Sequence, residues 1–138
     1  MQDKFGIDEA VELILKTDPR FHRDAYLFVR EVLDLAVEKL GRAKSSRADR
    51  HVSGPEMLMV FKEHALGQFG PMVPIVLETW GIRSCFDVGS IVYNLIESGI
   101  LGKSESDRIE DFRDVFDFHE AFVAPFLGGP GNNMAPNR

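Results

Sequence analysis

Residues 71–118 carry a close succession of helix start and stop signals, which limits the folds that this chain can adopt. Pro71 suits the first turn of a helix, because the first N–H groups of a helix have no partner within it. Gly81 supplies a left-handed stop. Ser84 then begins a second helix and Gly99 ends it. These signals predict two short helices separated by a tight turn.

The segment after Gly99 carries the pattern of two strands joined by a polar turn. Residues 100–101 begin the first strand, and residues 104–107 form the turn. The returning strand is predicted from three phenylalanines, Phe112, Phe116 and Phe118. A helix, a turn, a second helix and two strands follow one another in this order in a winged helix.

The first half of the chain predicts three further helices. Apolar residues recur at helical spacing over residues 7–15 and again over residues 23–40. Ser53 begins the third helix, where Ser53 and Glu56 can form a capping box. We therefore predict a mainly α fold with a small β-hairpin, in which N-terminal helices pack on a winged-helix-like helix-turn-helix with a two-stranded wing. Residues 1–127 form one domain, and the polar residues 128–138 form a disordered tail.

Composition narrows the class of protein. The chain has 138 residues, a formal charge of −6 and a single cysteine. That charge disfavours generic binding to nucleic acid or anionic membranes, and one cysteine excludes an intramolecular disulfide. No apolar run approaches the length of a membrane span, and the acidic N-terminus is unlike a signal peptide. We therefore expect a cytoplasmic protein that does not act at a membrane.

The outer face of the second helix in the 71–118 region bears on function. Its polar stripe consists of Asp87, Ser90, Asn94 and Glu97, at spacings of three and four residues. A helix that enters the DNA major groove usually offers Arg, Lys, Asn or Gln to the bases. This stripe carries two acids and no cation, so sequence-specific DNA binding through it is not expected. A partner protein with a basic surface is its natural complement.

One loop departs from the acidic average. Residues 42–51 contain four cations and one acid; the cations are Arg42, Lys44, Arg47 and Arg50. The simple interpretation is a solvated linker between two helices. The alternative is a loop that contacts nucleic acid or the ribosome, since four cations can make salt-sensitive phosphate contacts.

Candidate catalytic residues are few. Cys85 lies in the first turn of a predicted helix, where a thiol becomes more reactive, although it also suits a small buried position. His22, His51, His64 and His119 are scattered and form no zinc-binding spacing. The sequence therefore predicts no catalytic residue, cofactor or metal. The phenylalanines from Phe112 to Phe126 either complete the core or form an exposed patch for a partner.

Several phrases of the sequence together resemble one family. They are DPRF-x-x-x-AY-x-FV-x-E at 18–31, RHVSG, QFGPM, WGIRSC, DVGSIVYNLIESGILGKSESD and EDFRDVFDFHEAF. From about Ile7 to Phe122 the chain resembles a conserved family, found largely in Planctomycetes and Verrucomicrobia, whose function is unknown. The resemblance implies one complete domain and assigns no catalytic or binding residue.

Three functional hypotheses follow from the sequence. The first is a small non-enzymatic protein-interaction module, by analogy with winged helices that act as adaptors. The second is a nucleic-acid- or ribosome-associated regulator that binds through residues 42–51. The third is a thiol-dependent enzyme that uses Cys85.

Overall fold

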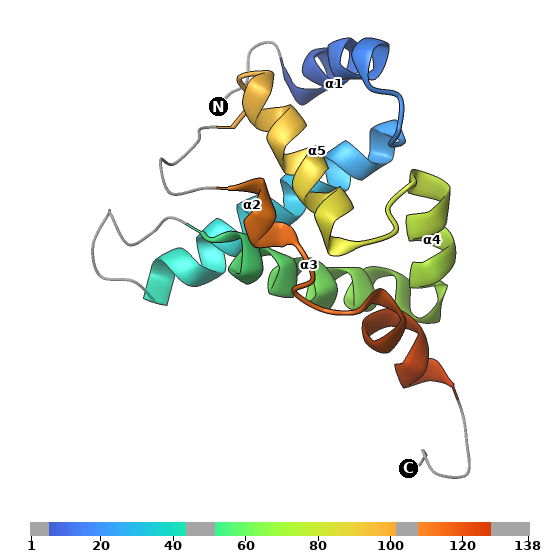
Figure 1. The fold of residues 1–138 in the computed structure, drawn as a ribbon. Coiled ribbons are helices and arrows are strands. Elements are labelled where there is room, and N and C mark those ends of the chain that lie inside the picture. Colours follow the sequence, from blue (N-terminus) through green and yellow to red (C-terminus); the bar gives the residue numbers. More distant parts are fainter. Residues whose placement is uncertain (1–5, 44–51, 102–107, 128–138) are drawn as a thin grey trace.

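The computed structural model describes residues 6–43, 52–101 and 108–127, with the side chains of residues 41–43 excepted. In those ranges the chain forms five α-helices and four shorter helical turns (Figure 1). They are α1 (Gly6–Thr17), α2 (Arg23–Ala43), α3 (Gly54–Phe69), η2 (Gly70–Met72), α4 (Val73–Trp80), α5 (Cys85–Glu97), η3 (Ile109–Phe112), η4 (His119–Val123) and η5 (Ala124–Phe126). The mainly helical prediction is therefore confirmed.

The predicted two-stranded wing is wrong, because the described residues on both sides of 102–107 contain no strand. The N–H groups of Ile100 and Leu101 both donate to the carbonyl of Leu95, at 3.1 and 3.4 Å. Those donors complete the C-terminal cap of α5 and are unavailable to a β-ladder. Phe112 is buried in the 3₁₀ turn η3. Because a winged helix requires these two strands, the winged-helix interpretation is wrong as well.

Local signals for the helices are reproduced closely. Ser53 and Glu56 form a reciprocal capping box, with the Glu56 N–H donating to Ser53 Oγ at 3.2 Å. Ser84 caps α5 by accepting the N–H of Asp87 at 3.3 Å. Gly81 has φ +86°, and its position is doubly constrained because an added Cβ would lie 2.5 Å from the carbonyl oxygen of Arg20. The predicted turn between α4 and α5 is therefore confirmed.

The second predicted helix of the 71–118 region, α5, is the centre of the fold rather than an exposed reading helix. It contacts α1, α2, α3 and η3, and Figure 1 shows it between α1 and α3. Its buried residues are Cys85, Val88, Gly89, Ser90, Ile91, Val92 and Leu95. These contacts leave α5 less exposed than the second helix of the winged-helix prediction.

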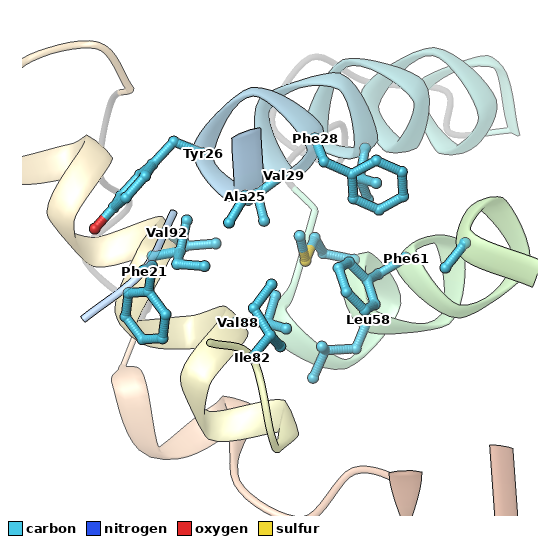
Figure 2. Close-up of a cluster of buried hydrophobic side chains, with 14 of the residues drawn as sticks. Phe21, Ala25, Tyr26, Phe28, Val29, Leu58, Phe61, Ile82, Val88 and Val92 are labelled. Carbon is cyan, nitrogen blue, oxygen red and sulfur yellow. The ribbon is translucent and has the colours of Figure 1, made fainter. Parts of the chain in front are cut away.

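One apolar core joins the helices. Figure 2 shows Val88 and Val92 of α5 facing side chains of α2 and the α1–α2 corner. Phe28 of α2 and Phe61 of α3 meet edge to face, with ring centroids 5.6 Å apart. Burying one such large side chain stabilises a fold by about 1.5–3 kcal/mol. The core thus fixes α5 and positions both of its ends.

Gly89 forms a seam between α5 and the C-terminal segment. An added Cβ at Gly89 would lie 2.7 Å from Cβ and Cγ of Phe112. Only a glycine allows η3 to approach the helix this closely. This contact fixes the start of the segment that continues into η4 and η5.

Candidate functional site

The four residues predicted as an interface on α5 do not form one exposed stripe. Asp87 accepts the backbone N–H of Arg83 at 2.8 Å. Ser90 is buried, and its hydroxyl donates to the carbonyl of Phe86 at 3.2 Å. Asp87 and Asn94 are half-buried, whereas Glu97 is exposed. The prediction of exposure is wrong for Ser90 and holds only in part for Asp87 and Asn94, because short polar side chains on a central helix can be satisfied inside the protein.

Asn94 instead closes the C-terminal end of α5 with a polar network. Its Nδ2 donates to Asp18 Oδ2 and to the Tyr26 hydroxyl, both at 3.0 Å. Arg20 makes two parallel hydrogen bonds to the Asp18 carboxylate, at 2.9 and 2.8 Å. The Arg20 guanidinium holds the pKa of Asp18 well below its usual value, with a smaller contribution in the same direction from Asn94. Burial raises the pKa of Tyr26. This network joins the α1–α2 corner to α5.

The candidate nucleic-acid residues cannot be placed. Lys44, Arg47 and Arg50 lie outside the described residues, and Arg42 lies in the last turn of α2, where the structure does not describe side chains. The hypothesis for residues 42–51 therefore stays a prediction.

A cleft opens at the other end of α5, between α4 and η4. Its first part, here called the apolar half, has a volume of about 300 Å³. Six of its lining side chains are apolar: Pro74, Leu77, Ile82, Phe118, Phe122 and Val123. Glu78, Arg83 and His119 complete the lining. Pockets of about 300–1,000 Å³ with mainly apolar walls and a few polar groups are typical of binding sites.

The second part of the cleft, here called the polar half, continues from the first. It has a volume of about 460 Å³ and shares Arg83, Phe118 and His119 with the apolar half. Its further lining residues are Ser84, Cys85, Asp114, Phe116 and Asp117. The cleft therefore offers an apolar surface beside a charged one.

Local structure explains how the sequence builds these walls. Gly81 turns the chain from α4 into α5, and the Ser84 cap places Cys85 in the first turn of α5. On the opposite wall, Asp117 Oδ2 accepts the N–H of Glu120 at 3.0 Å and so begins η4. Asp114 has φ +53°, a left-handed conformation that Asp and Asn tolerate better than most residues. This hydrogen bond orders the start of η4, which is a short π-helical turn.

Phe122 attaches the η4 wall to the core. It is 2% exposed and its ring meets Phe61 of α3 edge to face at 6.5 Å. Phe116 and Phe118 pack edge-on against the same ring at 5.9 and 5.1 Å. The phenylalanine-rich end is therefore mixed, since Phe112 and Phe122 are buried while Phe126 is exposed.

Some exposed apolar side chains lie in segments that adjoin the walls of the cleft. The described residues include seven large hydrophobic side chains that are exposed, and four of these lie on η2, on α4 or at the end of η5. They are Met72, Ile75, Phe126 and Leu127. The phenylalanine-rich end was predicted as a possible exposed patch. Met72 and Ile75 were not predicted to be exposed, because their segment was interpreted as the first helix of a winged helix.

Cys85 lies at the floor of the polar half in an unreactive setting. It is 2% exposed, and its thiol donates to the carbonyl of Phe116 at 3.3 Å. Burial raises the pKa of the Cys85 thiol, and the negative charges of Asp114 and Asp117 add to that rise. A nucleophilic cysteine needs the opposite shift.

The described ranges contain neither a candidate metal cluster nor a helix suited to span a membrane. Within residues 6–43, 52–101 and 108–127, no three or more His, Cys, Asp or Glu side chains are arranged to hold a metal ion. None of the described helices combines the length and apolar character needed to cross a membrane. Comparisons with protein-family models, with curated proteins and with solved structures gave no match to this chain.

Proposed function

We propose that this protein is a non-enzymatic protein-interaction module whose docking surface is the cleft between α4 and residues 114–123. The apolar half carries the proposal. It is a preformed hollow with six apolar side chains in its lining, and Ile75 of α4, the helix that forms one wall, is exposed. Apolar surface that remains in contact with water on a protein with a well-filled core usually marks a site for a partner.

The setting of Cys85 supports an interaction module over a thiol-dependent enzyme. Its raised pKa keeps the thiol protonated near neutral pH, and the protonated form is a poor nucleophile. His119 lines the same polar half, but the described hydrogen bond of the thiol goes to the carbonyl of Phe116. An activating base in contact with the nucleophile is the usual signature of such an enzyme.

A pull-down with a matched pair of variants tests the proposal. Val123→Lys places a cation in the apolar half, and its long side chain can reach water without unfolding the turn. Leu13→Lys makes the same charge change at an exposed apolar residue of α1, which lies at the far side of the molecule from η4 in Figure 1. We expect a stoichiometric, nuclease-resistant protein partner with the wild-type chain and with Leu13→Lys, and its loss with Val123→Lys.

Equal recovery with both variants would move the docking surface away from the cleft. Nuclease-sensitive recovery of RNA or DNA would favour the hypothesis for Arg42, Lys44, Arg47 and Arg50. Melting temperatures of all three proteins are needed beside the pull-down, because an unfolded variant also loses a partner.

A further inference from the structure

Resting on the proposed function, we infer that the cleft receives a partner segment that presents a large apolar side chain beside a lysine or arginine. The two halves of the cleft have different chemistry and share one boundary, formed by Arg83, Phe118 and His119. A ligand that fills both halves must therefore change from apolar to charged over a short distance.

The apolar half suits a side-chain anchor. Its volume of about 300 Å³ lies at the lower end of the range for pockets that enclose whole small molecules. Leu77, Ile82 and Phe122 at its base are almost fully buried, so the base is held by the core. A preformed base lowers the ordering cost of binding. Anchors of this kind are usually large apolar or aromatic side chains in water-excluding pockets.

The charges around the cleft select a basic neighbour for that anchor. Glu78 lines the apolar half, while Asp114 and Asp117 line the polar half. None of these three carboxylates is ion-paired within the described part of the chain. They are opposed by Arg83, which lines both halves.

Among the lining residues three carboxylates accompany one guanidinium. Two further cations lie nearby, with Lys62 Nζ 5.5 Å from the Phe116 ring centroid and Arg113 Cζ 4.5 Å from that of Phe86. The negative charge of the cleft is therefore concentrated at Asp114 and Asp117. Glu120 is exposed immediately after His119 and adds to it. Complementary charges across an interface provide specificity and speed association. A phosphorylated or acidic segment would meet Asp114 and Asp117 at the polar half and be repelled. The lysine or arginine of the partner should therefore lie toward those two aspartates, with the apolar anchor toward Val123.

Main-chain pairing to a sheet edge is not available to a partner among the described residues, since they contain no strand. Recognition must then rest on side chains rather than on β-augmentation. That makes the identity of the anchor and of its charged neighbour the determinants of affinity.

Selection from a library of random displayed peptides tests this inference with the full chain as bait. We expect enriched peptides to place a large apolar residue within two positions of Lys or Arg. An enriched peptide is then synthesised with a fluorescent label, and its affinity is measured by polarisation at low and high salt. Binding should weaken with salt, because exposed charge pairs are screened.

Three variants separate the two halves. Asp114→Asn combined with Asp117→Asn removes both charges while keeping a residue type that tolerates the left-handed conformation and can still cap η4. We expect the affinity for the peptide to fall about 3- to 10-fold and to lose most of its salt dependence. Val123→Lys should weaken binding more than tenfold, as expected for loss of a central anchor, and Leu13→Lys should leave it unchanged.

Each contrary result overturns a different statement. Enriched peptides without basic residues, or equal affinity for the double Asp variant, would overturn the basic neighbour while leaving the cleft as a docking surface. Binding that survives Val123→Lys, or no enrichment over a Val123→Lys bait, would overturn the cleft as the peptide site. A wild-type pull-down that recovered no protein partner, or only nucleic acid, would instead overturn the proposed function itself.

Discussion

The regions around the two ends of α5 use polar side chains in opposite ways. At the C-terminal end, Asn94 bridges Asp18 and Tyr26, and every bond lies between groups of the same chain. At the N-terminal end, Asp114 and Asp117 line a hollow beside apolar walls. Buried polar groups that satisfy one another hold a fold together, whereas polar groups around an open apolar cleft are available to a partner. For the polar groups around this helix, the presence of an internal hydrogen-bond partner is therefore more informative than their position along the chain.

The largest expected effect comes from disrupting the close contact between Gly89 and Phe112, which supports the wall of the cleft. Gly89→Ala would put a methyl group 2.7 Å from Phe112. Either α5 or η3 must move, and overpacking of this kind typically costs about 1–3 kcal/mol. We expect the midpoint of denaturant unfolding to fall accordingly, and peptide binding at the cleft to weaken because Phe112 begins the segment that forms the η4 wall.

Gly67→Ala is the matched control for that substitution. Gly67 lies in α3, where an added Cβ meets no atom within 4 Å. Alanine is a better helix former than glycine by about 1 kcal/mol, so this variant should be slightly more stable than the wild-type chain. If Gly89→Ala were equally stable, the close approach of α5 and η3 would be wrong.

The next effect concerns the polar network of Asn94 at the C-terminal end of α5. Asn94→Leu keeps a similar side-chain volume but removes the donor to Asp18 and to Tyr26, which is 0% exposed. Leaving buried polar groups unsatisfied costs about 1–3 kcal/mol. We expect that loss in the free energy of unfolding and no change in peptide binding at the cleft. Glu97→Gln, on an exposed residue of the same helix, should change stability by less than about 0.5 kcal/mol; a comparable loss there would remove the special role of the network.

A smaller effect is the pH dependence of stability that Asp18 of the same network provides. The pKa of Asp18 in the folded chain lies below its usual value of 3.8, chiefly because of the hydrogen bond from Arg20. Its carboxylate therefore stabilises the fold fully above about pH 4, and that contribution is lost as the pH falls through the folded pKa. Asp18→Asn should lower stability near neutral pH and make the remaining stability less sensitive to acid between about pH 4 and 2. Parallel acid-unfolding curves for the two proteins would contradict the network.

The same contrast shows how far the sequence alone could lead. Caps and stops act within a few residues, so Ser53, Ser84 and Gly81 could be placed correctly from the sequence. The environment of α5 is set by contacts across the chain, such as Asn94 with Asp18, 76 residues apart. A polar residue at helical spacing gives no sign of such a partner, so Ser90 and Asn94 were expected to face solvent.

The wing failed for a related physical reason. Phe112, Phe116 and Phe118 suit a strand by residue type, but strand formation depends on a neighbouring strand as well as on propensity. Here Phe112 packs against Gly89, and Phe116 and Phe118 pack against Phe122. Those aromatic contacts form the wall of the cleft, so the error in secondary structure hid the candidate site. On α4, Ile75 is exposed, but its apolar character alone did not distinguish it from the buried Leu77 of the same helix.

The smallest expected effect is on the reactivity of the Cys85 thiol beneath the polar half of the cleft. Cys85 is buried beneath the polar half, and burial raises its pKa, so a thiol reagent near neutral pH should label it at least about tenfold more slowly in the folded than in the unfolded chain. Ser84→Ala serves as a sharper test, because loss of the N-cap should loosen the first turn of α5, at a cost of about 1 kcal/mol, and speed the labelling. Rapid labelling of the wild-type fold would mean that the polar half of the cleft reaches the thiol, and it would favour the thiol-dependent enzyme. Labelling of the wild-type fold is instead expected to be slow. If a bound peptide with an apolar anchor and a basic neighbour slows it further, the peptide lies over Cys85 at the N-terminal end of α5.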